Sequence, residues 1–232
     1  LLSKVGVDEL TELEYLTPAY IDVQILDYLP ELDRKRFFDM KKSIRTSSKV
    51  SPAKVLQFEN ELIRANEKRF DYIMKLLSQQ EGFTLILFQD VKGGYGKKIH
   101  EKLLDMGELS YYVDGNVGIK IRNNIRHFLN NEKNKNKRIY YVASIGTTAA
   151  GLDIPRLNNL VFAEIGKSEV MVKQSIGRLL RLSDSKEFVK IYDIADDFTY
   201  GRSVNYSLRH LNDRLEFYEE DGHQLNVSKI KL

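Results

Sequence analysis

The segment QSIGRLLR, from Gln174 to Arg181, contains residue types suited to binding a triphosphate. On an α-helix Gln174, Arg178 and Arg181 fall at positions i, i+4 and i+7, so they share one face. Guanidinium groups stay charged and offer a rigid fork of donors to phosphate oxygens. Gly177 would let another segment or a ligand approach the backbone closely. The pattern fits a phosphate clamp or an ordinary solvated helix face, and spacing alone does not separate the two.

A second segment, SIGTTAAGLDIP from Ser144 to Pro155, directly follows the β-forming run RIYYVA. The hydroxyl and amide groups of Ser144, Thr147 and Thr148 can donate to phosphates. Asp153 is a candidate acceptor for a ribose hydroxyl. The alternative is a turn of small residues followed by an aspartate that caps a helix.

The loop GGYGKK, from Gly93 to Lys98, is similar to a nucleotide-binding P-loop but lacks two of its residues. A Walker A sequence is G-x-x-x-x-G-K-[ST]. Val91 stands where the first glycine belongs, and Lys98 stands where the hydroxyl that binds Mg²⁺ belongs. We therefore expect a contact with a phosphate backbone, or simple loop flexibility, rather than a nucleotide site.

The composition excludes several classes of site. The 232 residues include no cysteine, which excludes disulfides, thiolate catalysis and cysteine metal sites. Four scattered histidines give little support to a metal site, so we expect no metal ligands in this chain. The net charge of +3 says little about partners, and a nucleic-acid reading must rest on local basic clusters.

The chain shows no targeting segment and begins with Leu1-Leu2-Ser3-Lys4 rather than methionine. We expect a fragment or a processed chain from the cytoplasm of a bacterial or phage-infected cell. No apolar run in the sequence is long enough to cross a bilayer.

Short apolar runs alternate with amphipathic segments after Gly82. Strands are expected over 84–88, 110–113, 138–143, 160–163 and 188–193, and helices over 97–106, 119–131 and 169–182. This alternation predicts an α/β fold with a parallel sheet covered by helices on both faces. Such sheets bind ligands beyond the carboxyl ends of their strands, so the residues that follow each strand are the ones to inspect.

The flanking segments are less regular. We expect β-leaning stretches over 10–16 and 21–29, a charged helical segment after them, and helix over 53–80. The tail is expected to form a charged helix over 205–220 and a frayed or strand-like end.

Three groups of residues have simpler interpretations. The tyrosines at 111, 112, 140 and 141 are expected in the core or on the sheet surface. The acidic residues Asp193, Asp196 and Asp197 are expected to be caps and solvated charge rather than a metal cluster. The basic run 133–138 is expected to be a solvated loop that could add salt-sensitive DNA affinity.

Taken in order, GLDIP (151–155) and QSIGRLLR (174–181) resemble motifs V and VI of superfamily 2 helicases. The run 84–89 with its glycine loop is similar to motif IV. The stretch YYVDG (111–115), Arg122 and Phe128 resemble the segment between motifs IV and V. The resemblance covers residues 82–198, and the preceding NEKR (66–69) also suits it. The motifs are separated by short segments, and Gln174 stands in place of the His-Arg of DEAD-box proteins. In both features the chain resembles the UvsW-type DNA helicases of phages.

The resemblance implies a second RecA-like domain, with an N-terminal connector and a C-terminal helix. It implies a connector over 1–75, the RecA-like domain over 76–200 and a helical extension over 201–232. ATP with Mg²⁺ would lie in a cleft between this domain and a first RecA-like domain, which would hold most of the Mg²⁺ ligands.

The resemblance also implies roles for particular residues. Arg178 and Arg181 would be arginine fingers, and Gln174 would contact the γ-phosphate or its attacking water. Nucleotide-side positions are Gly151, Asp153 and Gly177, of which the first two would couple ATP to the strand contacts. Contacts with the sugar-phosphate backbone are expected from Ser144, Thr147, Lys92, Gly93 and Gly115.

The chain departs from the complete family pattern, because it contains neither a Walker A sequence nor D-E-x-[DH]. We therefore expect no ATP hydrolysis by this chain alone. The expected function of the complete protein is that of an ATP-dependent DNA helicase or translocase that remodels branches in recombination and repair. Two alternatives remain: a nucleic-acid-binding or regulatory module that has lost the motor, and an RNA helicase.

Overall fold

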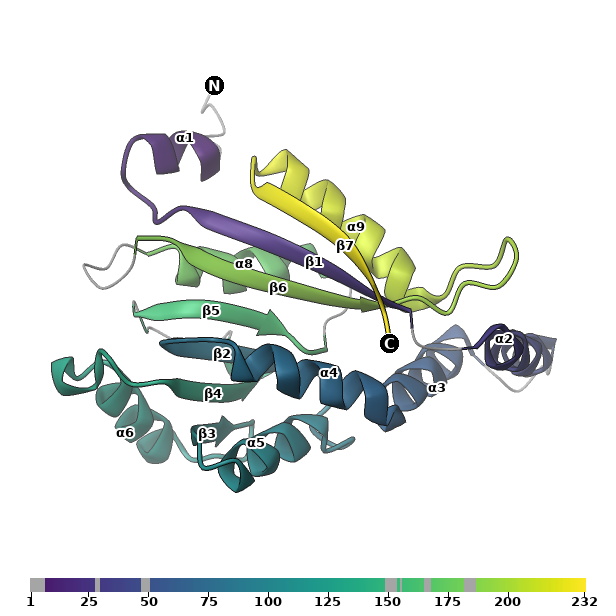
Figure 1. Cartoon of the computed structure of the whole chain (residues 1–232), viewed down its shortest axis with the longest axis horizontal. Coiled ribbons are helices and arrows are strands. Elements are labelled where there is room, and N and C mark those ends of the chain that lie inside the picture. Colours follow the sequence, from purple (N-terminus) through teal and green to yellow (C-terminus); the bar gives the residue numbers. More distant parts are fainter. Residues whose placement is uncertain are drawn as a thin grey trace.

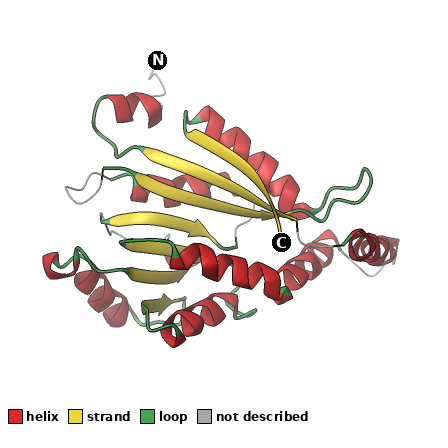
Figure 2. Cartoon of the chain, in the orientation of Figure 1, coloured by secondary structure: helices red, strands yellow, loops and turns green. Residues whose placement is uncertain are grey.

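The computed structural model describes residues 7–27, 30–46, 51–148, 154, 156–164, 168–181 and 187–232. Its centre is a sheet of seven strands, and every pair of neighbouring strands is parallel (Figures 1 and 2). The strand order is β3-β4-β2-β5-β6-β1-β7. The strands are β1 Ala19–Asp27, β2 Phe83–Phe88, β3 Leu109–Val113, β4 Ile139–Ser144, β5 Leu157–Phe162, β6 Val189–Asp196 and β7 Gln224–Lys231.

Helices cover both faces of this sheet (Figure 1). One face is covered by α6 (Ile119–Leu129), α8 (Glu169–Leu179) and α9 (Tyr206–Glu220). The other is covered by α2 (Glu31–Thr46), α3 (Pro52–Ala65), α4 (Glu67–Ser78) and α5 (Tyr95–Asp105). The predicted α/β class, with a parallel sheet between two helical layers, is confirmed.

The central strands are apolar at nearly every position because both of their faces are covered. All six residues of β2 and all six of β4 are buried. Their side chains alternate between two hydrophobic cores: Leu85 and Leu87 belong to one, and Ile86 and Phe88 to the other. A continuous apolar run is the expected sequence of a strand that is buried on both faces.

Three expected elements differ from the structure. The stretch 10–16 is expected to be β-leaning, but its first three residues belong to the helix α1 (Val7–Glu12), and turns follow. The helix over 53–80 is two helices, because Asn66 has an extended backbone and its side chain accepts a hydrogen bond from the Arg69 N–H. The helix expected over 169–182 ends at Leu179, so Arg181 lies beyond it.

Both flanking segments contribute a strand to the sheet. In β1 the register pairs Ile21 with Ile191 of β6 on one side and with Leu225 of β7 on the other. The strand-like end of the chain is therefore β7. The domain boundaries at residues 75 and 200 stay a prediction. The strand β1 precedes the first boundary and β7 follows the second, and both belong to the same sheet as the strands between the boundaries.

A buried ion pair holds α9 against β6. Both oxygens of Asp193 accept hydrogen bonds of 2.7 Å from Arg214, and one also accepts from the Tyr218 hydroxyl at 2.8 Å. Asp193 and Arg214 are almost completely buried. The nearby Asp196 is also buried, and it accepts a hydrogen bond of 2.7 Å from Arg69 on α4. The interpretation of Asp193, Asp196 and Asp197 as solvated charge was wrong, because each is buried and paired with a cation.

Candidate nucleotide and nucleic-acid site

The structure brings the expected nucleic-acid contacts to one end of the sheet. Lys92 and Gly93 follow β2, Gly115 follows β3, and Ser144 and Thr147 lie at the end of β4 and in the short helix α7 (Ile145–Thr148). These three strands are neighbours in the order β3-β4-β2, and all are parallel. We name the carboxyl ends of these strands, with their loops 89–94, 114–118 and 144–148, the open end.

The two hydroxyl side chains of the open end are bonded to each other. The Thr147 hydroxyl donates to the Ser144 carbonyl at 2.7 Å, and the Ser144 and Thr147 hydroxyls lie 3.1 Å apart. Because Thr147 uses its proton on the carbonyl, Ser144 is the donor between the two hydroxyls. Each hydroxyl would have to give up its present hydrogen bond before it could donate to a phosphate.

The loop after β2 needs its glycines for reasons of packing. A methyl group on Gly93 would lie 3.0 Å from the guanidinium carbon of Arg64, and one on Gly96 would lie 2.3 Å from the Phe88 ring. Gly94 begins α5 with φ of 71°, in the left-handed region that favours glycine. Lys98 pairs with Glu67 at 2.9 Å. Gly93 and Gly96 thus make room for neighbouring side chains, and Gly94 supplies the backbone conformation that begins α5. The exclusion of a P-loop here stays a prediction.

Arg122 shapes the loop after β3. Its Nε donates to the Val117 carbonyl at 2.6 Å, and its Nη2 donates to the Gly115 carbonyl at 3.2 Å. The Asp114 carboxylate accepts from the Asn116 N–H at 2.8 Å. Gly115 is exposed, and a methyl group there would lie more than 4 Å from every described residue other than its chain neighbours. The loop is thus held from inside while its outer surface stays open.

The other expected site residues lie on or near α8. Its apolar side, formed by Val172, Ile176, Leu179 and Leu180, packs in the core as predicted. Gln174 and Gly177 are exposed, and a methyl group on Gly177 would have no neighbour within 4 Å. Arg181 is exposed just after the helix, and its carbonyl accepts a hydrogen bond from Thr17. The side chain of Arg178, and Gly151 and Asp153 entirely, lie outside the described residues.

A group of polar residues that the sequence did not reveal lies beside the open end. Arg64 on α3 pairs with Asp90 at 2.8 Å and with Glu164 at 3.3 Å. A cavity of about 400 Å³ is lined by these three residues, by Arg69 and by His210. Burial raises the pKa of Glu164, although the nearby Arg64 and Arg69 oppose the shift. Glu164 follows β5 directly, so the inspection of residues after each strand could have found it.

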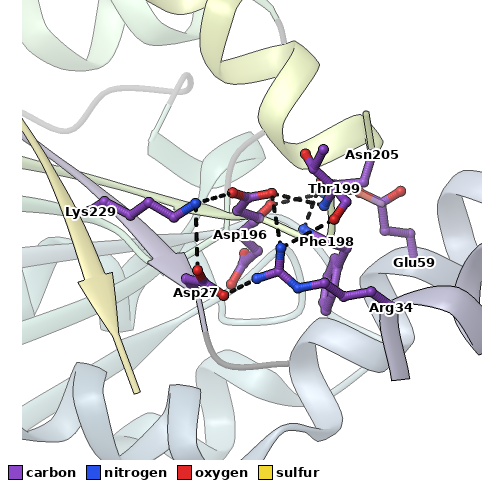
Figure 3. A network of polar contacts seen from close by, with 9 residues as sticks. Asp27, Arg34, Glu59, Asp196, Phe198, Thr199, Asn205 and Lys229 are labelled. Carbon is purple, nitrogen blue, oxygen red and sulfur yellow. Dashed lines mark hydrogen bonds and ion pairs between the residues drawn. The ribbon is translucent and has the colours of Figure 1, made fainter. Parts of the chain in front are cut away.

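The carboxyl ends of β6, β1 and β7 are different, and we name them the closed end. Lys229 of β7 lies 2.7 Å from Asp197. Lys229 also lies 3.5 Å from Asp27, with which Arg34 of α2 pairs as well (Figure 3). Burial alone would raise the pKa of Asp197, but hydrogen bonds from Lys229 and Thr199 lower it. The carboxylates here are matched by cations within the chain.

Two properties of the described residues concern metals and membranes. Among them there is no group of three His, Asp or Glu side chains arranged to hold a metal ion. None of the helices in the described ranges is both long and apolar enough to cross a membrane.

Comparison with known proteins identifies similar chains. The chain is 31% identical over 192 residues to the ATP-dependent DNA helicase uvsW of Enterobacteria phage T4, a match that covers 77% of this chain and 37% of that protein. The crystal structure of T4 UvsW superposes with a TM-score of 0.70 at 24% identity, covering 93% of this chain and 42% of that one. The C-terminal domain of the DEAD-box protein Dbp5 has the same fold, with a TM-score of 0.53 at 12% identity, over 94% of this chain and 92% of that domain.

No protein-family model matches the chain. The chain spans well under half the length of the phage helicase that it resembles.

Proposed function

Because this chain belongs to the superfamily 2 helicases, as a C-terminal RecA-like domain of the UvsW type, we propose that it is the second motor domain of an ATP-dependent DNA helicase or translocase. The complete protein would remodel branched DNA, by unwinding or annealing, in recombination and repair. T4 UvsW, which is named an ATP-dependent DNA helicase, supports the choice of DNA.

The outer side of α8 is the observation that carries this proposal. Gln174 and Gly177 are exposed there, and among the described residues nothing lies within 4 Å of a methyl group placed on Gly177, so packing against them does not require a glycine. A helix interior disfavours glycine by about 1 kcal/mol relative to alanine. A glycine at such a position is explained if another domain, or its bound ATP, approaches this side of α8.

The residues fit ATP in part. Arg178 and Arg181 would supply donors to the phosphates, and such arginines can raise the rate of phosphoryl transfer by ~10³–10⁵ in other enzymes. Gln174 would hold the γ-phosphate or the attacking water. Gly151 and Asp153 would couple the bound ATP to the contacts with the DNA strand. The phosphate-binding lysine and most Mg²⁺ ligands would come from a first RecA-like domain, since this chain has no Walker A sequence.

The open end would contact the DNA backbone through Lys92, Gly93, Gly115, Ser144 and Thr147. Contacts of this kind position a strand without reading its bases. ATP-driven closure of the two domains, followed by opening after hydrolysis, would move these contacts along the strand.

Measurement of DNA-stimulated ATP hydrolysis tests the proposal, with this chain alone and with the complete protein that includes a first motor domain. We expect activity in the complete protein alone, and we expect Arg178→Ala to abolish it while DNA binding persists. Arg45→Ala is the matched control, because Arg45 is an exposed arginine on α2, on the other face of the sheet. Turnover retained by Arg178→Ala would exclude the arginine-finger role.

Two alternatives predict different results. A binding module without motor activity, which the missing Walker sequences favour, would show no stimulated turnover in any form of the protein. An RNA helicase would be stimulated by single-stranded RNA and not by DNA.

A further inference from the structure

Glu164, beside the open end, connects the end of β5 to the loop after β2 and to α3. It stands two residues after the last residue of β5, and its Oε2 accepts hydrogen bonds from the N–H groups of Gln89 and Asp90, both at 3.3 Å. Its Oε1 lies 3.3 Å from Nη1 of Arg64 on α3. The side chain is only 10% exposed, so these partners replace the water that a surface carboxylate would have.

Arg64 continues the connection into the loop after β2. The same Nη1 lies 2.8 Å from Oδ2 of Asp90, whose Oδ1 accepts a hydrogen bond from the Lys92 N–H at 2.9 Å. Gly93 leaves the space that this guanidinium occupies, since a methyl group there would lie 3.0 Å from it. The backbone of Lys92, a proposed DNA contact, is therefore linked through Asp90 and Arg64 to Glu164.

Glu164 also lies close to α8 in the sequence. Ser168, the N-cap residue of α8, stands four residues after Glu164. The preceding carbonyl, that of Ala163, accepts a hydrogen bond of 2.8 Å from Arg69, which is itself paired with Asp196. Because that contact holds the end of β5 in place, a displaced loop would act on the Glu164 side chain rather than on the strand.

The neighbouring cavity gives the ion-paired side chains space to rearrange. It measures about 400 Å³ and is lined by Arg64, Asp90 and Glu164, among others. Side chains in a close-packed interior would lack that freedom.

We propose that Glu164, paired with Arg64, is a positioning residue that couples DNA contact at the loop 89–94 to the placement of α8, and so to the stimulation of ATP hydrolysis. The proposal rests on the proposed function, because it assigns the loop to DNA and α8 to the nucleotide. Glu164 contacts neither ligand in this scheme.

The test compares Glu164→Ala and Glu164→Gln in the complete protein. Alanine removes the acceptor of both loop N–H groups and the ion pair. Glutamine keeps an oxygen for the N–H groups but loses the charge that Arg64 contacts. The matched control is Glu67→Gln, because Glu67 is an exposed glutamate whose ion pair with Lys98 does not touch the loop 89–94.

We expect a loss of stimulation without a loss of binding. At saturating single-stranded DNA, the rate of ATP hydrolysis should fall roughly tenfold in Glu164→Ala, a typical size for coupling between sites, and by less in Glu164→Gln. The rate without DNA, and the dissociation constant for DNA measured by fluorescence anisotropy, should change less than about twofold, since neither ligand loses a contact. Glu67→Gln should behave as the unchanged protein.

Two results would overturn the proposal. One is full DNA stimulation in Glu164→Ala, which would mean that the contacts transmit nothing. The other is a parallel fall in the rate without DNA and in DNA affinity, which would indicate a merely structural role. Glu164→Gln is expected to fold, because the glutamine amide oxygen has nearly the same shape and can still accept hydrogen bonds from the N–H groups of Gln89 and Asp90.

The controls also separate this proposal from the function on which it rests. Absence of DNA-stimulated hydrolysis in the unchanged complete protein would remove the proposed function, and the coupling with it. Normal stimulation in both the unchanged protein and the Glu164 variants would remove the coupling alone.

Discussion

The open end and the closed end lie at the same edge of one parallel sheet, but they differ in how their polar residues are engaged. At the closed end Asp27 is paired with Arg34 (Figure 3), and Asp197 is paired with Lys229. At the open end Lys92 and Gly115 are exposed. Ligands of parallel α/β sheets bind beyond the carboxyl ends of the strands. The difference indicates which part of that edge is available for a partner and which part the chain has filled with its own side chains.

Close to the closed end, α3 is joined to the start of α9, although the two helices are about 140 residues apart in the sequence. Glu59 of α3 is completely buried and accepts hydrogen bonds of 2.9 Å and 2.7 Å from the N–H groups of Tyr206 and Ser207. These groups begin α9, where a carboxylate is favoured by the helix dipole. Substitutions in this region should therefore change stability, whereas substitutions at the open end should change binding.

The largest effect is expected for Arg214→Met. The substitution leaves the buried Asp193 carboxylate without its cation, which typically costs 3–5 kcal/mol of the free energy of unfolding. Urea denaturation of the isolated chain measures it. Arg209→Met, an exposed arginine on the same helix, is the control and should change stability by less than about 0.5 kcal/mol. A loss in Arg214→Met no larger than in the control would mean that this end of the molecule is not held as the structure indicates.

A smaller effect, on binding alone, is expected for Lys92→Ala. If Lys92 contacts a phosphate, its removal should reduce the slope of log affinity against log salt by roughly one. Lys229→Ala removes the same charge at the closed end and should leave that slope unchanged, because Lys229 is engaged with Asp197 and Asp27. DNA titrations at several salt concentrations measure both. Equal slopes for the two variants would contradict the division between open and closed ends.

The strands of this edge could be predicted from the sequence, but their partners could not. The apolar runs in β2 and β4 are continuous because these strands are buried on both faces. The place of β1 beside β6 depends on pairing between residues such as Ile21 and Ile191, far apart in the chain, which no local pattern contains. The helix α1 was missed because its six residues are too short to display a helical period.

The same limit applies to the charged residues. The sequence shows that Asp193 and Asp196 are acidic, but not that Arg214 and Arg69 reach them, from 21 and 127 residues away. Glu164 could have been noticed by its place after β5, but its pairing could not, since its partner Arg64 precedes it by 100 residues. The motif residues could be located by their order and spacing, and their roles stay predictions.

The smallest change in the free energy of unfolding is expected for Gly177→Ala. This substitution should raise stability but lower ATP turnover. The new methyl group meets no atom of the part of the chain that the structure describes, so replacing a helical glycine should stabilise the isolated chain by about 0.5–1 kcal/mol. In the complete protein the same methyl group would obstruct the proposed approach of the first motor domain to α8, so ATP turnover should fall. Gly96→Ala is the contrasting variant, because its methyl group would lie 2.3 Å from the Phe88 ring and should destabilise the fold. Urea denaturation and ATP turnover, measured on each variant, separate the two effects. A Gly177→Ala protein with full turnover would show that this side of α8 is ordinary solvent-exposed surface, and the open region would then be confined to the strand ends.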